Sequence, residues 1–244
     1  MIEKKCTNMP ARTYDDPVFR EKRKIKNPIK FKIQLNEEQK LAKEAILSNT
    51  ITLLAGKAGS GKTLLACQVA LDGLFRRHYE KVIITRPTVS KEEIGFLPGD
   101  LHQKMDPWVQ PIYQNMYALY GKDKVQPFID SGQIEIVPVS FMRGRTFLDS
   151  CIIVDEAQNV TNDQMEMIVT RVGLRSKMIV CGDDGQVDLK NRADSGFRFL
   201  YNQAFKVKRL ESITLFQNHR DPIVDELIDI YEEENYKRNK RRNK

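Results

Sequence analysis

Short apolar runs alternate with stretches of helical periodicity along most of this chain. A run of strand length that is apolar throughout is typical of a strand buried on both faces, as in a parallel sheet. Such runs predict strands at 50–56, 81–85, 133–139, 151–156, 177–183 and 208–215. Apolar residues spaced three or four apart predict helices at 35–48, 62–77, 161–172, 195–204 and 222–235. This alternation indicates an α/β fold, in which a parallel sheet carries helices on both faces.

One long connection, 88–132, interrupts the alternation. Two short helices are expected inside it, at 101–105 and 111–120. At the start of the first predicted helix, Asn36 and Gln39 have the spacing of a capping box. The simplest organisation is a single α/β domain over residues 33–236.

Charge sets the two ends of the chain apart from this domain. The net charge is +7, and residues 1–32 hold ten Lys/Arg against four Asp/Glu. Residues 237–244 hold six Lys/Arg and no acid, so the domain between the ends is net acidic. We therefore separate a basic N-terminal arm, 1–32, and a basic C-terminal tail, 237–244. Such segments either contact nucleic-acid phosphates or are solvated, disordered tails, and both interpretations stay open.

Composition bears on the cellular setting. No run approaches the roughly 18 apolar residues of a membrane span, and the start of the chain lacks the apolar stretch of a signal peptide. The four cysteines, Cys6, Cys67, Cys151 and Cys181, are scattered without a CxxC pair. Buried thiols in a reducing compartment explain them better than disulfides or a metal site. We expect a cytoplasmic protein with no membrane partner.

The stretch GKAGSGKT, residues 56–63, satisfies every fixed position of the pattern G-x-x-x-x-G-K-[ST]. It follows a predicted strand and opens a predicted helix, which is the setting in which backbone N–H groups cradle phosphates. Lys62 is expected to reach the β- and γ-phosphates, and the Thr63 hydroxyl to be a ligand of Mg²⁺. The residues of this loop that we assign to nucleotide binding are Gly56, Ala58, Gly59, Ser60, Gly61, Lys62 and Thr63.

Two adjacent carboxylates, Asp155 and Glu156, end the apolar run 151–156. Side by side they repel, and they are costly to bury unless a cation offsets their charge. In P-loop nucleoside triphosphatases a second strand brings an Asp to Mg²⁺, and Asp155 suits that role. Glu156 is then placed to activate the attacking water as a general base. The pair favours hydrolysis over phosphate transfer to another acceptor.

Two glutamines are candidates for nucleotide contacts. Gln186 closes GDDGQ, a G-D-x-x-Q pattern, and is a candidate partner for the γ-phosphate or the attacking water; an ordinary polar turn is the alternative. The Gln39 amide has a donor and an acceptor that match the N6 and N7 edge of adenine, with the capping box as its alternative role. His219 is expected to be structural.

Several arginines have the chemistry to bind phosphate. A guanidinium can contact phosphate through two N–H groups and stabilise transition-state charge, in cis or from a neighbouring subunit. Arg220 is our candidate for a γ-phosphate sensor or finger, and Arg143 and Arg145 for a finger in trans or a nucleic-acid contact. Thr85 and Arg86 lie at the C-terminal end of a predicted strand, where a nucleic-acid contact competes with a simple turn.

Taken in order, these motifs resemble those of the PhoH-like family of P-loop ATPases. The matching stretches are GKAGSGKT, ITRPTVSKEEIGFLPGDL, FMRGRTFLDSCIIVDEAQN, CGDDGQVDL with SGF after it, and HRDPIV. GFLPGDL and RGRTFLDS…DEAQN are more specific to the family than the phosphate loop, whereas NHRDPIV departs from its more usual Arg-His order. The resemblance implies a RecA-like P-loop ATPase core, similar to superfamily 1 helicases, that uses ATP and Mg²⁺.

The resemblance also bears on assembly and partners. A superfamily 1 motor closes two RecA-like domains around ATP, whereas this chain has room for one. A neighbouring subunit would supply the second wall, and the resemblance implies a ring, a hexamer. Our leading hypothesis is a helicase-like ATPase that acts on RNA or single-stranded DNA. The alternatives are an ATP-dependent switch or scaffold for a protein partner, and a phosphotransferase.

Overall fold

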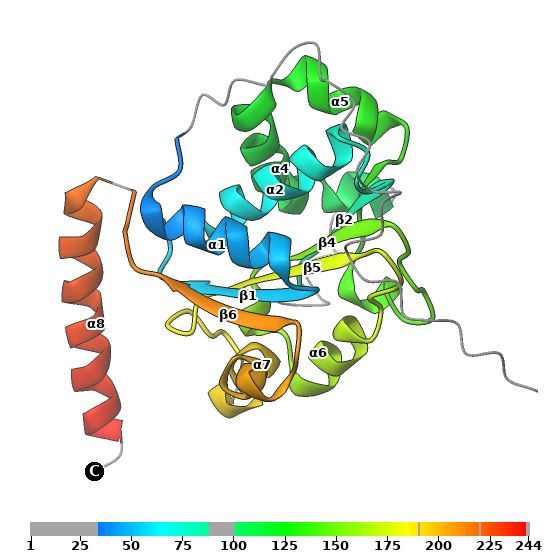
Figure 1. The fold of residues 1–244 in the computed structure, drawn as a ribbon. Coiled ribbons are helices and arrows are strands. Elements are labelled where there is room, and N and C mark those ends of the chain that lie inside the picture. Colours follow the sequence, from blue (N-terminus) through cyan, green and yellow to red (C-terminus); the bar gives the residue numbers. More distant parts are fainter. Residues whose placement is uncertain (1–33, 88–100, 190, 220, 243–244) are drawn as a thin grey trace, which may run out of the picture. The chain divides into compact units, whose positions relative to one another are not determined.

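The computed structural model describes residues 34–87, 101–189, 191–219 and 221–242. The strands are β1 (Ile51–Gly56), β2 (Lys81–Thr85), β3 (Ile134–Ile136), β4 (Ser150–Val154), β5 (Lys177–Gly182) and β6 (Leu210–Leu215). They form one sheet in the order β3-β2-β4-β5-β1-β6, and every pairing is parallel (Figure 1). Every residue of the central strands β4 and β5 is buried, which explains why their sequences are apolar without alternation.

Helices cover both faces of the sheet (Figure 1). On one face lie α1 (Glu37–Ser48), α2 (Lys62–Phe75), α4 (Leu101–Tyr120) and α5 (Lys122–Asp130). On the other lie α6 (Asn162–Val169) and α7 (Gly196–Gln203), and a last helix, α8 (Pro222–Arg242), follows β6. The predicted RecA-like α/β class, with a parallel sheet between two helical layers, is confirmed.

Strand order decides where the chemistry lies. All parallel strands end at the same edge of the sheet, and β5 separates β1 from β4. The phosphate loop after β1 and the carboxylates after β4 therefore open at one edge, a single strand apart. Ligands of open α/β sheets bind at this carboxyl edge.

The long connection is more helical than predicted. One helix, α4, replaces the two short helices expected at 101–105 and 111–120, and α5 follows it. The helix contains Pro107 and Pro111, and each of them lacks a backbone donor. However, Ile112, Met116 and Leu119 are buried on this helix, which packs against α2. Burial of this apolar face outweighs the missing hydrogen bonds.

The C-terminal helix is also longer than predicted. The helix expected at 222–235 runs to Arg242 as α8, so helical backbone crosses the start of the proposed tail at 237. Lys and Arg are good helix formers, and this segment has no Gly or Pro to end it. The proposed arm, 1–32, lies outside the described residues. Within the part of the chain that the structure describes, no helix has both the length and the apolar character needed to cross a bilayer.

The described cysteines belong to the core. Cys67, Cys151 and Cys181 are free and buried, as the sequence predicts. Burial raises the pKa of the Cys151 thiol to about 12. Cys6 lies outside the described residues.

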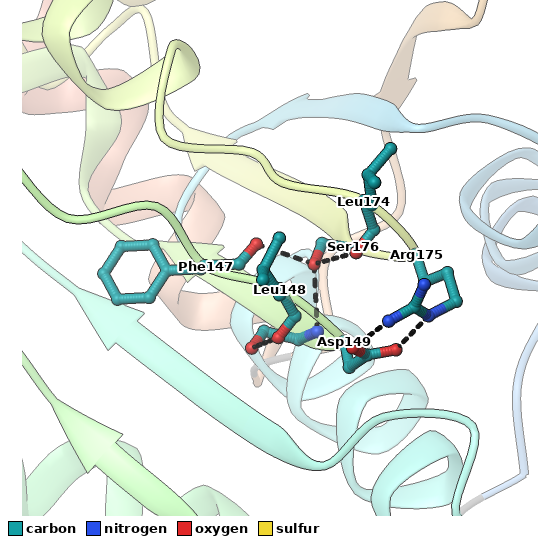
Figure 2. A network of polar contacts seen from close by, with 7 residues as sticks. Phe147, Leu148, Asp149, Leu174, Arg175 and Ser176 are labelled. Carbon is teal, nitrogen blue, oxygen red and sulfur yellow. Dashed lines mark hydrogen bonds and ion pairs between the residues drawn. The ribbon is translucent and has the colours of Figure 1, made fainter. Parts of the chain in front are cut away.

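Polar contacts organise the opposite, amino edge of the sheet, where β4 and β5 begin (Figure 2). The Ser176 hydroxyl accepts a hydrogen bond from Ser150 N at 3.0 Å and donates to Phe147 O at 2.8 Å. Beside it, Arg175 pairs with Asp149 through two nitrogens (Figure 2). Both of these residues have positive φ, 56° and 48°, so the two strand entrances turn sharply. These contacts hold β4 and β5 in register away from the ligand edge.

A buried lysine joins β5 to the end of α1. Lys177 is 4% exposed, and its ammonium group donates to Leu47 O at 2.7 Å and Asn49 O at 2.5 Å. Carbonyl groups at a helix C-terminus carry partial negative charge and favour a cation. Burial nevertheless dominates, and it lowers the pKa of Lys177 to about 8.

We predict that Lys177 makes the domain more stable as pH rises from about 8 to about 10.5. In this window the unfolded chain still holds the proton that folded Lys177 has released, so the free energy of unfolding increases with pH. Relative to Lys177→Met, the wild type should gain up to about 3 kcal/mol, measured by urea unfolding at each pH. Lys81→Met, at an exposed position, is the matched control. A wild-type-to-Lys177→Met difference that stays constant with pH would contradict the prediction.

Candidate nucleotide-binding site

A cavity of about 470 Å³ lies at the carboxyl edge of the sheet. Its lining includes residues that are far apart in the sequence, and nine of them are predicted site residues. These are Gln39, Ala58, Gly59, Gly61, Lys62, Thr63, Asp155, Glu156 and Gln186. The fold thus brings the main motifs to one place.

The phosphate loop depends on glycine at several positions. Gly56, Gly59 and Gly61 have φ values of 153°, 91° and 84°, which L residues rarely adopt. A Cβ atom on Gly56 would lie 2.5 Å from Leu215 O, and one on Gly61 would lie 2.7 Å from the Gln39 amide nitrogen. The loop is therefore closely packed as well as sharply turned. Helix α2 begins directly after it, which turns the helix N-terminus toward the loop.

Lys62 lies at the start of α2 with its ammonium group on the loop backbone. Its Nζ donates to Gly56 O at 2.6 Å and to Lys57 O at 2.9 Å. These contacts keep the positive charge beside the N–H groups that would receive phosphate. The loop fits a polyanion in both charge and geometry.

Thr63 and Asp155 meet although 92 residues separate them. The Thr63 hydroxyl donates to Asp155 Oδ1 at 2.7 Å, and Asp155 is only 6% exposed. Burial raises the pKa of the Asp155 carboxyl, with a smaller contribution from neighbouring Glu156. A divalent cation would offset this buried negative charge, and oxygen atoms of this kind are what Mg²⁺ prefers. The donor set therefore fits Mg²⁺.

Protein side chains alone would not complete such a metal site. No group of three or more His, Cys, Asp or Glu suited to a metal occurs among the described residues. Mg²⁺ commonly takes one or two protein ligands and fills the rest of its shell with phosphate oxygens and water. The site fits a metal that is bound together with a nucleotide.

Glu156 follows β4 in a left-handed conformation, with φ 51° and ψ 38°. This conformation is uncommon for a residue with a long side chain, and it turns Glu156 away from the direction of the strand. One carboxylate oxygen, Oε1, lies 3.5 Å from a guanidinium nitrogen of Arg86. The other, Oε2, accepts a hydrogen bond from Gln158 Nε2 at 2.7 Å. Both oxygens therefore have a partner in the protein.

Sequence reasoning did not single out Gln158. This side chain is 1% exposed, and its Oε1 accepts a hydrogen bond from Asp183 N at 3.0 Å while its Nε2 donates to Glu156. It thereby links the carboxylate after β4 to the GDDGQ segment after β5. The available signal was its place in DEAQ, two residues after Glu156. Asn115 of α4 also lines the cavity, and no motif marked it.

Gln39 is the N3 residue of α1, and the predicted capping box is present. The Asn36 side chain accepts from Gln39 N at 2.7 Å, and Gln39 Oε1 accepts from Asn36 N at 3.3 Å. The Gln39 amide nitrogen also faces Ser60 O at 3.4 Å and His219 Nε2 at 3.1 Å. One buried side chain thus connects α1, the phosphate loop and the segment after β6.

The same contacts position the ring of His219. Backbone N–H groups can only donate, so the amide oxygens of Asn36 and Gln39 face those N–H groups and the amide nitrogens face His219. Both nitrogens lie 3.1 Å from His219 Nε2. His219 N also donates to Gly59 O at 3.1 Å, so its contacts hold the loop in place.

The remaining candidates, Gln186, Arg145 and Arg143, differ in whether they line the cavity. Gln186 is exposed and lines the cavity. Arg145 makes a two-pronged ion pair with Glu135 at 2.8 and 2.9 Å and lies over the Phe147 ring, which is a structural arrangement. Arg143 is exposed and is not among the residues that line the cavity.

Thr85 and Arg86 were candidates for contact with a nucleic-acid backbone, and they differ in exposure. Thr85 is fully buried, so the idea that it contacts a nucleic-acid backbone is wrong. A strand covered on both faces leaves no room for such a contact. Arg86, the next residue, is partly exposed and reaches Glu156. Arg220 lies outside the described residues.

This chain is similar to a known protein family and to several of its members. The family described as PhoH-like protein matches residues 32–232. A PhoH-like protein of Synechocystis sp. is 40% identical over 192 residues, which cover 78% of this chain and 58% of that protein. A PhoH-like protein of Bacillus subtilis is 40% identical over 194 residues, covering 78% of this chain and 61% of that protein. This chain thus spans about three-fifths of the length of these relatives.

Solved structures give weaker likenesses. Pif1 helicase from Candida albicans aligns with a TM-score of 0.42 and 16% identity, over 81% of this chain and 43% of that one. The SWI2/SNF2 ATPase core of Sulfolobus solfataricus, in complex with dsDNA, aligns with a TM-score of 0.43 and 14% identity, over 77% and 46%. Likenesses at this level carry no argument about function.

Proposed function

Because this chain belongs to the PhoH-like protein family, we propose that it is a Mg²⁺-dependent ATPase that couples hydrolysis to RNA or single-stranded DNA. One observation carries the proposal: Lys62, Thr63, Asp155 and Glu156 line a single cavity. They supply a phosphate-binding cation, two metal ligands and a carboxylate base. A phosphotransferase would need a site for an acceptor hydroxyl, and no motif for one is present in the sequence.

Binding follows from the loop and its neighbours. The N–H groups at the start of α2 and the Lys62 ammonium would hold the β- and γ-phosphates. Thr63 Oγ1 and Asp155 Oδ1, which are 2.7 Å apart, would share Mg²⁺. When bound, Mg²⁺ supplies positive charge that offsets the negative charge developing on the phosphate oxygens.

Hydrolysis requires water to attack the γ-phosphorus while the bond to the bridging oxygen breaks. The role we assign to Glu156 is to accept the proton that the attacking water loses. Lys62 stabilises the oxygens of the phosphoryl group in transit. Gln186, at the rim of the cavity, is our candidate for orienting the water or sensing the γ-phosphate.

Coupling to nucleic acid is supported by charge and position. Both ends of the chain are basic, and Arg86 lies partly exposed at the carboxyl edge of the sheet. A homo-oligomeric ring, a hexamer, completes the proposal because one RecA-like core provides only one wall of a motor's ATP site. Arg220 or Arg143 of a neighbouring subunit would then be the finger in trans. Light scattering with ATP and Mg²⁺ present measures the number of subunits.

The deciding experiment is steady-state ATP hydrolysis with added single-stranded RNA, single-stranded DNA or duplex. We expect a Glu156-dependent rate that one of the single-stranded polymers increases. A Glu156-dependent rate that none of the three polymers changes would reject the nucleic-acid coupling and keep the ATPase.

A specific observation favours a second candidate, an ATP-dependent switch or scaffold for a protein partner. Helix α8 exposes large apolar side chains at helical spacing, namely Ile223, Leu227, Ile230 and Tyr231, each 48% exposed or more. Clustered exposed apolar surface is typical of protein interfaces. In this case hydrolysis is slow and indifferent to nucleic acid. The same surface also suits contacts between subunits of a ring.

Adenine selection by Gln39 is part of our proposal, and we predict its effect on nucleotide choice. Gln39→Ala should lower the preference for ATP over GTP by about tenfold, the value of one lost hydrogen bond. Competition binding with a fluorescent ATP analogue measures it. Gln164→Ala is a matched control because Thr161 and Gln164 form the capping box of α6. Both variants should lose about 1 kcal/mol of stability. An unchanged preference in Gln39→Ala would leave Gln39 only its structural contacts, in the capping box and to Ser60 and His219.

A further inference from the structure

Arg86 and Glu156 are 70 residues apart in sequence and meet at the carboxyl edge of the sheet. Strand β2 pairs with β4 in a register that sets Thr85 opposite Val154. The pairing continues for one more bond, because Asp155 N donates to Thr85 O at 2.9 Å. The residues that follow, Arg86 and Glu156, therefore leave the sheet side by side. Their side chains are 24% and 37% exposed, so solvent reaches the pair.

The two oxygens of Glu156 are held by partners of different kinds. Gln158 is buried, and its amide orientation is determined because its oxygen accepts from Asp183 N. Its 2.7 Å hydrogen bond therefore ties Oε2 to a buried side chain with a fixed orientation. Arg86 instead makes one long contact of 3.5 Å to Oε1, from a side chain that solvent reaches. Of the two carboxylate oxygens, Oε1 is therefore the one whose protein partner another group can replace.

This difference matters for hydrolysis. Each carboxylate oxygen has two lone pairs, so Oε1 can accept from Arg86 and from a water together, but the two donors then share the same negative charge. While Arg86 remains in place, its guanidinium holds Oε1 and draws on the charge that would attract a proton from water. Turnover should therefore depend on where the Arg86 guanidinium goes.

We propose that Arg86 restrains Glu156 and that a backbone phosphate of single-stranded nucleic acid releases it by binding the Arg86 guanidinium. The inference rests on the proposed ATPase and names how its rate is controlled. Guanidinium groups bind phosphate in a two-pronged geometry that is stronger than one 3.5 Å contact, so the exchange is favourable. The pair also lies at the sheet edge where ligands reach parallel α/β domains.

The test is ATP hydrolysis by Arg86→Ala with and without single-stranded poly(U) RNA, and with single-stranded poly(dT). We expect the rate without polymer to rise roughly threefold to fivefold, as for the loss of one partly exposed ion pair. The ratio of the rate with polymer to the rate without polymer should fall toward one. The double variant that also carries Glu156→Gln should lose hydrolysis both with and without polymer. Arg175→Ala is the matched control, since it removes an ion-paired arginine from the opposite edge of the sheet. It should keep the wild-type rate and stimulation.

A binding measurement separates release from simple structural damage. The affinity of Arg86→Ala for labelled poly(U), measured by anisotropy across salt concentrations, should show a log–log slope smaller by about one, as for one lost phosphate contact. Arg86→Lys keeps the charge without the planar fork, and its rate should lie between those of wild type and Arg86→Ala. It also provides the test if Arg86→Ala fails to fold, which thermal unfolding reports.

The opposite results have distinct meanings. A lower rate without polymer, with stimulation retained, would show that Arg86 positions Glu156 for catalysis and would overturn the restraint. An unchanged rate and an unchanged salt slope would also overturn it. A wild type that hydrolyses ATP but responds to neither polymer would overturn release by nucleic acid, together with the coupling in the proposed function. In that case the rate of Arg86→Ala alone decides whether Arg86 restrains Glu156.

Discussion

Lys62→Ala is expected to lower kcat/KM for ATP hydrolysis by at least about a hundredfold, the loss typical when one donor to developing charge is removed. The Lys62 ammonium lies 2.6 Å from Gly56 O and 2.9 Å from Lys57 O, at the mouth of the phosphate loop. Alanine removes the side-chain cation of the loop that is closest to the expected β- and γ-phosphates. Binding of ATP and turnover should both fall, as measured by isothermal titration calorimetry and phosphate release.

Lys57→Ala is the matched control for this variant. It removes the same charge from the same loop at an exposed position that the motif leaves open. We expect it to keep turnover within about threefold of the wild type, because an exposed charge contributes little. Near-normal hydrolysis by Lys62→Ala would remove the assignment of residues 56–63 as a phosphate loop.

Glu156→Gln is expected to keep ATP binding and to lose hydrolysis by roughly two to four orders of magnitude, as for loss of a general base. The amide has nearly the same shape as the carboxylate, so the left-handed backbone at this residue can be retained. It cannot accept a proton from water. ATP affinity measured by calorimetry should therefore stay close to that of the wild type while single-turnover hydrolysis nearly stops.

Glu166→Gln, on the exposed side of α6, makes the same chemical change away from the cavity and should leave hydrolysis unchanged. Equal loss of binding and hydrolysis in Glu156→Gln would show that Glu156 has a structural role, through its contacts to Arg86 and Gln158. A matching fall in thermal stability would point the same way. Retained hydrolysis would remove Glu156 as the base.

The strands of the sheet could be predicted from the sequence, because a parallel strand that is buried on both faces is apolar along its whole length. β2 occupies the predicted residues 81–85, and β5 begins at the predicted Lys177. The connection after β2 was misjudged for a physical reason. Proline marks a local break, but the burial of Ile112 and Met116 against the rest of the domain keeps α4 continuous.

The motifs predicted which residues would lie together at the site. They did not predict the hydrogen-bond or ion-pair partner of each side chain. Gln39 was weighed between a helix cap and an adenine contact, and the structure shows the cap together with bonds to Ser60 and His219. Arg145 was a candidate for phosphate, and it pairs with Glu135 instead. Long side chains take the partner that folding brings nearest, and sequence spacing does not report that distance.

The sequence by itself determined the chemistry available at the carboxyl edge, because a glycine-rich loop and paired acids act through local geometry. It established Lys62 and Thr63 at the start of a helix, and Asp155 and Glu156 at the end of a buried strand. Only the tertiary structure decided how those charges are balanced. Arg86 meets Glu156 because β2 lies beside β4, and Thr63 meets Asp155 because one strand separates β1 from β4. Strand order is a property of the folded sheet, and it sets which distant residues share a hydrogen bond.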